Sequence, residues 1–282
     1  MIDGRGRRSD SLPAVALPEP SASSAALITG ASSGIGEEIA RQLAARGHNL
    51  ILVARREDRL RDLADELSGA HGIRAEAVAV SLDDARGRDE LAARVSTLGL
   101  DVDVLVNNAG FGGSGEVHRA DRARLGAMVA LNCEALVDLQ ARYSGPMAER
   151  GQGAIVNIAS TASFQPIPGT ATYAATKAFV LSFSEGTHSE LSGKGVSVTA
   201  VCPGPVKTEF TEVAGIGGAE DRLPDFFWTD VERVARDAVE GAAKGRRVVV
   251  PGLVNRAGAL AGQHTPRALV LPLAKRAWRQ AL

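Results

Sequence analysis

Seven short runs of apolar residues, rich in β-branched side chains, recur along residues 25–250 and are separated by segments with helical spacing. The runs are residues 26–28, 50–53, 77–80, 102–106, 154–158, 196–201 and 248–250. A strand that is covered by helices on both faces is apolar throughout instead of alternating, and this is typical of parallel sheets. The pattern therefore predicts an α/β fold: a single doubly wound, parallel, seven-stranded sheet with helices on both faces.

One of the helices is expected to start near Thr229. Thr229 and Glu232 have the spacing of a capping box, in which each side chain accepts a hydrogen bond from a backbone N–H group at the start of the helix. The apolar residues that follow share one helical face: Val231, Val234, Ala235, Ala238 and Val239.

The two ends of the chain differ from this pattern. Residues 1–24 are rich in Arg, Ser, Pro and Ala and show no period, which predicts a disordered N-terminal tail. Residues 251–282 hold five basic residues and no acidic one. Their spacing predicts a basic, partly amphipathic C-terminal extension, in which Pro272 should kink or start a helix.

Two roles are open for residues 251–282. A basic amphipathic segment with a tryptophan can lie on an anionic membrane surface. Five charges give only modest attraction, however, and salt screens it. Packing on the domain or across a subunit interface is therefore favoured over membrane contact. A homo-oligomer is expected, with dimer and tetramer both open.

Composition excludes several classes of function. The 32 Lys and Arg residues nearly balance the 33 Asp and Glu residues, so no overall field attracts nucleic acid. The two cysteines, Cys133 and Cys202, lie in apolar segments without metal spacing, and the five histidines show none either; no metal is expected. Buried, reduced cysteines are typical of a cytoplasmic protein. No apolar run approaches the ~18–20 residues of a membrane span, and a signal peptide is not expected.

A glycine-rich turn, residues 29–36, directly follows the first predicted strand and opens a helix. Such a turn offers backbone N–H groups and a helix N-terminus to a pyrophosphate. We expect Gly30 to permit the turn, Gly34 to let the backbone approach the phosphates, and Gly36 to allow close packing of helix on strand.

Three polar residues downstream form a candidate catalytic set: Ser160, Tyr173 and Lys177. Reduction of a ketone needs hydride at carbon and a proton at oxygen. A free phenol has a pKa near ~10, and Lys177, one helical turn after Tyr173, would stabilise the phenolate. A pKa lower by about three units needs roughly 4 kcal/mol, which the ammonium and an oxidised nicotinamide could supply together. Ser160 would donate a hydrogen bond to the substrate oxygen.

Taken singly, Tyr173 could be a packed helix residue, Lys177 a solvated charge and Ser160 a strand-end cap. As a set that follows the glycine turn, they indicate a nicotinamide-dependent oxidoreductase. The order GxxxGxG, Asn107-Asn108-Ala109-Gly110, Ser, YxxxK and Pro203-Gly204 resembles the short-chain dehydrogenase/reductase family over residues 25–250.

The resemblance implies a Rossmann-type catalytic domain over residues 25–250. It also implies that the Lys177 ammonium holds the nicotinamide ribose and that Asn132 anchors a proton-relay water, although a mid-helix asparagine can simply bond to backbone. The implied catalytic residues are Asn132, Ser160, Tyr173 and Lys177. The implied cofactor-binding residues are Gly30, Ser32, Ser33, Gly34, Ile35, Gly36, Arg55, Arg56, Leu82, Asn107, Asn108, Ala109, Gly110, Tyr173, Lys177, Pro203, Gly204, Val206 and Thr208.

The residues after the second strand favour NADP(H) over NAD(H). An acidic residue there would bind the ribose 2′-hydroxyl and repel a 2′-phosphate, but this chain has Ala54 followed by Arg55 and Arg56. Guanidinium groups match phosphate geometry, although both arginines could also be solvated charges. Ser81 stands where relatives usually carry an aspartate that reaches the adenine, and the Leu82 backbone could serve instead.

Aromatic residues follow several of these motifs, namely Phe111, Phe164, Phe210 and residues 226–228. They predict an apolar substrate pocket, although each could instead belong to the core. The expected function is NADP(H)-dependent hydride transfer to or from the carbonyl or secondary alcohol of an apolar small molecule. The alternative is a non-catalytic NADP(H)-binding regulatory or redox-sensing protein. Such proteins usually lack the tyrosine or the lysine, so the enzyme is favoured.

Overall fold

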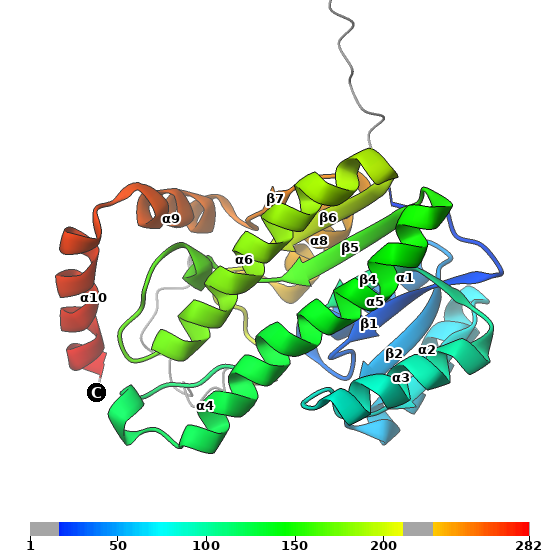
Figure 1. The fold of residues 1–282 in the computed structure, drawn as a ribbon, viewed down its shortest axis with the longest axis horizontal. Helices are drawn as coiled ribbons and strands as arrows, with labels where there is room; N and C mark the ends of the chain where they lie inside the picture. Colours follow the sequence, from blue (N-terminus) through cyan, green and yellow to red (C-terminus); the bar gives the residue numbers. More distant parts are fainter. Residues whose placement is uncertain (1–16, 211–227, 282) are drawn as a thin grey trace, which may run out of the picture.

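The computed structural model describes residues 17–210 and 228–281, with the side chains of residues 273 and 277–281 excepted. Seven parallel strands form one sheet in the order β3-β2-β1-β4-β5-β6-β7 (Figure 1). The strands are β1 (Ser24–Thr29), β2 (Asn49–Ala54), β3 (Ala75–Ala79), β4 (Asp101–Asn107), β5 (Gly153–Ile158), β6 (Val196–Val201) and β7 (Val248–Val249). Each predicted apolar run coincides with one strand, and the doubly wound, Rossmann-type fold is confirmed.

Helices cover both faces of the sheet (Figure 1). The helices are α1 (Gly34–Ala44), α2 (Glu57–His71), α3 (Ala85–Leu98), α4 (Arg122–Val129), α5 (Ala135–Arg150), α6 (Ala171–Leu191), α8 (Val231–Ala243), α9 (Leu253–His264) and α10 (Arg267–Ala281). Short 3₁₀ turns lie at η1 (Val117–Arg119), η3 (Thr161–Phe164) and η4 (Ser192–Lys194), and a π-helical turn, η2 (Ala130–Glu134), joins α4 to α5.

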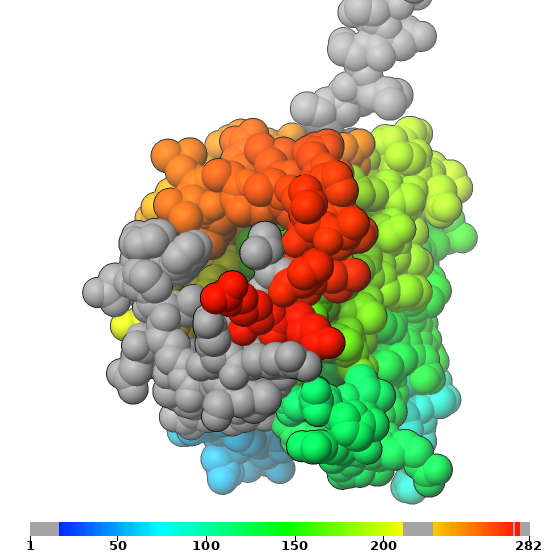
Figure 2. Space-filling view, turned by 90° about the vertical axis from the view of Figure 1, so that its left-hand side faces the viewer, coloured from blue at the N-terminus to red at the C-terminus, as the bar shows by residue number. Residues whose placement is uncertain are grey.

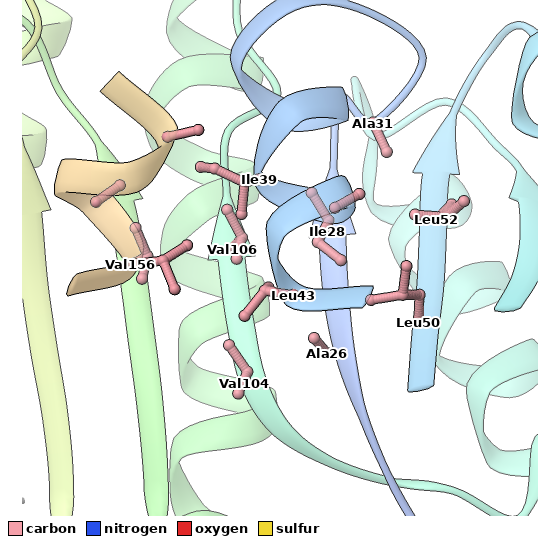
Figure 3. Packing of buried hydrophobic residues seen from close by; sticks show 14 of the residues in the cluster. Ala26, Ile28, Ala31, Ile39, Leu43, Leu50, Leu52, Val104, Val106 and Val156 are labelled. Atoms are coloured by element: carbon pink, nitrogen blue, oxygen red, sulfur yellow. The ribbon is translucent and has the colours of Figure 1, made fainter. Parts of the chain in front are cut away.

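The core explains why the strands are mainly apolar on both faces, with a few buried polar exceptions such as Asp103, Asn157 and Thr199. Neighbouring side chains of a strand point to opposite faces of the sheet. In β1, Ala26 and Ile28 join one buried cluster with residues of α1, α2 and α8, whereas Ala25 and Leu27 join a second cluster under α3 and α5. Figure 3 shows α1 packed over β1 and β4 in the first cluster. Because both faces are buried, no position in the strand favours a polar side chain.

The strand order reverses beside β1. From β1 the chain moves outward to β3 and then crosses back to β4 on the other side of β1. The helices therefore diverge above the carboxyl ends of β1 and β4, which opens a crevice where ligands bind in open α/β sheets.

The N-terminal boundary differs from the prediction. Leu17 packs against the first core cluster, and the side chain of Asn49 donates hydrogen bonds to the carbonyls of Ser21 (3.0 Å) and Ser24 (2.9 Å). The predicted disordered tail is therefore wrong for residues 17–24, because backbone contacts not visible as a pattern hold them on the domain. Residues 1–16 lie outside the described part of the chain.

The predicted capping box is also wrong. Helix α8 begins at Val231, and Asp230 at its N-cap makes no side-chain capping bond. The Thr229 hydroxyl is instead an acceptor for Asn255 Nδ2 at 2.8 Å. A distant tertiary contact has replaced the local one.

Helices α9 and α10 lie at one end of the molecule (Figure 1), and Figure 2 looks onto this end. Asn255 anchors α9, since it is buried and its amide also donates to the carbonyl of Pro251 at 3.3 Å. Arg267, at the start of α10, donates to the carbonyl of Phe164 at 3.3 Å. The part of residues 251–282 that forms α9 and the start of α10 is therefore attached to the domain. Pro272 lies inside α10 and does not start it.

The exposed surface of α9 and α10 includes Leu253, Leu260, Leu269 and Leu271. Across the described residues, no helix is both long and apolar enough to cross a bilayer. Membrane-surface contact, oligomerisation and a cytoplasmic location stay predictions. Cys202 is buried and Cys133 half-buried, and burial raises the pKa of both thiols, which agrees with a packing role.

Candidate active site

A cavity of about 810 Å³ opens at the carboxyl ends of the strands. Its size lies within the usual range for cofactor and small-molecule sites. Most of the sequence-predicted residues line it: Gly30, Ser32, Ser33, Gly34, Ile35, Arg55, Arg56, Leu82, Asn108, Ala109, Gly110, Ser160, Tyr173, Lys177, Pro203, Gly204, Val206 and Thr208. Three do not, namely Gly36, Asn107 and Asn132. The structure therefore brings motifs that lie between Gly30 and Thr208 in the sequence into one space.

The glycine turn is shaped by two residues with positive φ, Gly30 (+66°) and Gly34 (+60°). A side chain at either would be strained. A Cβ atom at Gly36 would lie 2.4 Å from Asn108 Nδ2 and 2.5 Å from the Gly30 carbonyl oxygen. Gly36 thus serves close packing, as expected, while Gly34 is required at least as much by its backbone angle as by any approach of a ligand.

Asn108 joins the glycine turn to the end of β4. Its side-chain amide donates to the carbonyls of Thr29 (3.0 Å) and Gly30 (3.1 Å). In the other direction, the Thr29 hydroxyl accepts from the backbone N–H groups of Asn108 (2.9 Å) and Ala109 (3.0 Å). These four bonds fix the floor of the crevice, so Asn108 acts by holding the turn in position.

Asn107 lies away from the cavity, contrary to its predicted cofactor contact. It is buried and pairs in register with Asn157 of β5, to which its Nδ2 donates at 2.9 Å. Asn157 in turn donates to Gln140 (2.8 Å) and Ser184 (2.9 Å). The reason is the two-residue period of a strand: Asn107 and Asn108 are neighbours, so their side chains diverge.

Tyr173 and Lys177 project from the first turns of α6 into the cavity. The Lys177 ammonium lies 5.9 Å from the centre of the Tyr173 ring and donates to the Ile158 carbonyl at 2.8 Å. Burial lowers the pKa of Lys177 to about 8. Burial also raises the pKa of Tyr173 to about 12, and a hydrogen bond with the Ser160 side chain acts against this rise. In the protein alone the phenol is therefore neutral and can donate its proton.

Ser160 lies at the carboxyl end of β5, where the chain enters η3. Its hydroxyl oxygen accepts from the Ala162 N–H at 3.1 Å. This cap uses one lone pair, and the proton is left for another acceptor. The strand-end cap and the catalytic role are thus compatible.

Asn132 lies in the π-helical turn η2 and is buried. Its side chain accepts from the Phe111 N–H (3.0 Å) and donates to the Phe111 carbonyl (3.0 Å) and the Thr176 hydroxyl (3.1 Å). Local π-turns are frequent at functional sites. Asn132 therefore ties the segment after β4 to the catalytic helix α6 from behind the cavity wall.

Two arginines, Arg56 and Arg59, meet at the end of the cavity that lies opposite the catalytic residues. Arg56 donates to the hydroxyls of Ser32 (2.9 Å) and Ser33 (2.8 Å) and to a carboxylate oxygen of Glu209 (2.7 Å). Arg59, three residues later on α2, donates to the other Glu209 oxygen at 2.6 Å. Both arginines hold the pKa of Glu209 down at about 2. Of the predicted pair, Arg56 contacts the glycine turn, and Arg55 is an exposed residue of the cavity wall.

The matching family model, described as short chain dehydrogenase, covers residues 24–216. The protein belongs to this family. NADP-dependent 3-hydroxy acid dehydrogenase YdfG from Salmonella typhi is 39% identical over 199 residues, which are 69% of this chain and 77% of the relative. A short-chain dehydrogenase from Sphingobium yanoikuyae in complex with NADPH is 37% identical with a TM-score of 0.76, covering 85% of this chain and 92% of that one. The bulky-bulky ketone specific alcohol dehydrogenase from Comamonas testosteroni is 32% identical with a TM-score of 0.72, covering 93% and 96%.

Against the family pattern, the structure adds residues that the sequence did not single out. Asp83 lines the cavity beside Leu82, and Ser81 donates to its carboxylate at 2.8 Å. This acidic side chain lies on the cavity wall two positions after Ser81. The Leu82 carbonyl already accepts from Arg88 at 3.2 Å. The presence of an acidic residue just after β3 was the signal in the sequence that could have identified Asp83.

Glu209 and Asn255 were also missed. Arg59 belongs to the stretch after β2 that resembles a bacterial NADP-dependent subgroup of the family, but it was not assigned to the site. Arg59 had a signal, because residues three apart on a helix share a face with Arg56. Glu209 and Asn255 had none, since their contacts join segments far apart in sequence.

Among the described residues, the far part of the cavity wall combines aromatic side chains with the cation of Arg124. Phe111, Phe210 and Trp228 line it, and the Phe210 ring lies 5.7 Å from that of Tyr173. The Arg124 guanidinium stacks 5.3 Å from the centre of the Phe111 ring. Phe164 packs on the core instead of lining the cavity, and residues 226 and 227 lie outside the described part of the chain. Within that part, no group of three His, Cys, Asp or Glu residues could hold a metal.

Proposed function

We propose that the protein is an NADP(H)-dependent oxidoreductase that transfers a hydride between the nicotinamide and a carbonyl or secondary alcohol, with Tyr173 as acid/base. The observation that carries the proposal is that Ser160, Tyr173 and Lys177 line one cavity with the glycine turn. A phosphate-binding turn and a proton donor in the same space are what hydride transfer to a carbonyl requires.

The residues present fit NADP(H). The glycine turn places a helix N-terminus at the crevice, and Gly30 lines the cavity at a position where an added Cβ would lie 2.7 Å from Asn108 Nδ2. Arg55, Arg56 and Arg59 lie after β2, where an acidic residue would select NAD(H). The Salmonella relative is named NADP-dependent, and the Sphingobium structure contains NADPH. When bound, the reduced cofactor supplies the hydride.

Each catalytic side chain has a separate task. Tyr173 holds the proton that the substrate oxygen receives, and Ser160 donates a hydrogen bond to that oxygen as its negative charge develops. The Lys177 ammonium, in a buried environment, stabilises the phenolate that Tyr173 becomes. Its lowered pKa of about 8 keeps it charged at neutral pH but close to titration. Asn132 is a positioning residue, since its amide bonds to the backbone of Phe111 and to the Thr176 hydroxyl and does not line the cavity.

The substrate is an apolar small molecule with a carbonyl or secondary alcohol. Phe111, Phe210 and Trp228 support this assignment, and the Comamonas neighbour is named for bulky ketones. A second class has an observation of its own: Arg124 lines the same part of the cavity and could pair with a substrate carboxylate. The Salmonella relative is named for 3-hydroxy acids, which carry such a group.

Tyr173→Phe tests the reaction. The variant should bind NADPH like the wild type but lose a factor of about 10²–10⁴ in kcat, because the ring stays and only the proton donor is removed. Stopped-flow absorbance of NADPH with a panel of ketones and aldehydes measures turnover, and titration by calorimetry measures binding. A variant that keeps more than about a tenth of kcat would refute the role of Tyr173.

The same panel separates the substrate classes. If the substrate is apolar, Arg124→Gln should leave kcat/KM for bulky ketones within about twofold. If it is a keto acid, kcat/KM for acids should fall roughly tenfold or more, because a charged hydrogen bond contributes about 1.5–3 kcal/mol. Absence of turnover with every member of the panel would favour the alternative, a non-catalytic NADP(H)-binding protein.

A further inference from the structure

The carboxylate of Glu209 bridges two arginines at the cofactor end of the cavity. One oxygen accepts from Arg56 at 2.7 Å and the other from Arg59 at 2.6 Å. Both arginines extend from the start of α2, whereas Glu209 belongs to the segment after β6, 150 residues later than Arg59. The chain thus supplies its own anion to the cluster that should receive the anion of a cofactor.

A carboxylate and a phosphate present similar oxygen edges to guanidinium groups. Arg56 is simultaneously bonded to Ser32 and Ser33 of the glycine turn, so its head group is fixed next to the path of the cofactor. Arg59 has no such second contact among the described residues and is held by Glu209. Two positive groups at fixed spacing form the kind of site that a phosphate of about −1.5 to −2 charge can occupy.

Resting on the NADP(H) dependence proposed above, in which the arginines that follow β2 receive the 2′-phosphate, we propose that the Glu209 carboxylate occupies that place, between Arg56 and Arg59, until the phosphate displaces it. Glu209 competes with the phosphate, so it weakens NADP(H) binding without touching NAD(H).

The exchange is favourable in charge and small in cost. The side chains of Arg56, Arg59 and Glu209 are 42%, 51% and 42% exposed, so water already screens their pairing. The incoming phosphate carries more charge and more acceptor oxygens than the carboxylate that leaves. Once displaced, the Glu209 carboxylate can be hydrated without a large movement, because its side chain is already exposed.

Displacement of Glu209 also affects the substrate end of the cavity, through the next residue, Phe210. The Phe210 ring packs against Tyr173, with centroids 5.7 Å apart. Two residues earlier than Glu209, the Lys207 ammonium lies 5.6 Å from the centre of the Trp228 ring. Movement of Glu209 therefore disturbs a segment that contacts both the catalytic tyrosine and a tryptophan, which offers an optical signal.

Binding of NADP⁺ and NAD⁺ by calorimetry tests the site without any turnover. Glu209→Gln should bind NADP⁺ about fivefold more tightly, equivalent to about 1 kcal/mol, with NAD⁺ affinity unchanged. Arg59→Gln should weaken NADP⁺ about tenfold and leave NAD⁺ unchanged. The matched control is Glu57→Gln, which removes the same charge from the start of α2 but pairs with Arg61, outside the cluster; it should change NADP⁺ affinity less than twofold.

Fluorescence tests the displacement itself. In a Trp278→Phe background, NADP⁺ should change the emission of Trp228 and NAD⁺ should change it much less, and Glu209→Gln should abolish this difference. Equal gains from Glu209→Gln and Glu57→Gln would overturn displacement in favour of general electrostatics. Weaker NADP⁺ binding by Glu209→Gln, or equal loss of both cofactors in Arg59→Gln, would overturn the site. Since none of these measurements needs catalysis, a failure here is distinguishable from a failure of the proposed reaction.

Discussion

Replacement of Gly36 by alanine is the sharpest test of how the glycine turn is built. Gly36 lies in the first turn of α1, where helix propensity alone favours alanine. The added Cβ would meet Asn108 Nδ2 at 2.4 Å and the Gly30 carbonyl oxygen at 2.5 Å. The carbonyl is backbone, and the Asn108 amide is held by bonds to Thr29 and Gly30, so neither neighbour can move freely.

The expected cost follows from these contacts. Moving Asn108 away breaks two hydrogen bonds of about 1 kcal/mol each. Overpacking a close contact costs a further ~1–3 kcal/mol, and removing glycine from a helix returns about 1 kcal/mol. The free energy of unfolding should fall by about 2–4 kcal/mol, which lowers Tm by roughly 3–7 °C in a protein of this size.

Gly69→Ala is the matched control. Gly69 lies in α2 and is exposed, and a Cβ there meets nothing within 4 Å. It should raise the free energy of unfolding by roughly 0.5–1 kcal/mol. Calorimetric melting and NADPH titration of both variants check the prediction. If Gly36→Ala melts within a degree of wild type and binds NADPH equally well, the turn is not closed by Asn108 as argued.

Two further predictions concern titration. The chain has five lysines, so ¹³C NMR after reductive methylation can identify the Lys177 signal as the one that the Lys177→Arg variant lacks. The Lys177 signal should titrate near pH 8. NADPH affinity should fall as the pH rises through that value, because the ammonium charge is lost. A titration near ~10.4 would contradict the buried ammonium. His48 is buried, which lowers its pKa to about 4, so the unfolded state binds its proton first and stability is lost as pH falls from 6.5 to 4. Wild type should lose about 3 kcal/mol more than His48→Gln over this range in urea unfolding, and parallel curves would refute it.

Much of the fold was accessible from the sequence because both faces of the sheet are buried. In β1, Ala25, Ala26, Leu27 and Ile28 all lie in core clusters, so the strand leaves a continuous apolar run. Motifs at the ends of such runs must meet at one edge of a parallel sheet. This is why the glycine turn and Ser160 could be assigned to one site before the structure.

Assignments that depend on register or on distant contacts were less accessible. Asn107 faces Asn157 because these residues are paired in the β4–β5 ladder, and neither the pairing nor its register is visible as a local pattern. Thr229 has a capping-box neighbour at the right spacing, yet its hydroxyl bonds to Asn255 of α9. A local sequence pattern shows which hydrogen bonds a side chain is able to make, and the tertiary contacts determine which of them it makes.

The segment after β6 connects the two halves of the cavity. Pro203 and Gly204 leave the strand beside the catalytic residues, and a Cβ at Gly204 would lie 2.3 Å from Asn255 Oδ1, so α9 can approach only because this residue is glycine. Five residues on, Glu209 binds the arginines at the cofactor end, and Phe210 turns back to Tyr173. Because so short a segment contacts both ends, the displacement of Glu209 proposed above would also change the wall that the substrate meets. The proposal therefore predicts that cofactor preference and substrate fit are coupled through one stretch of chain.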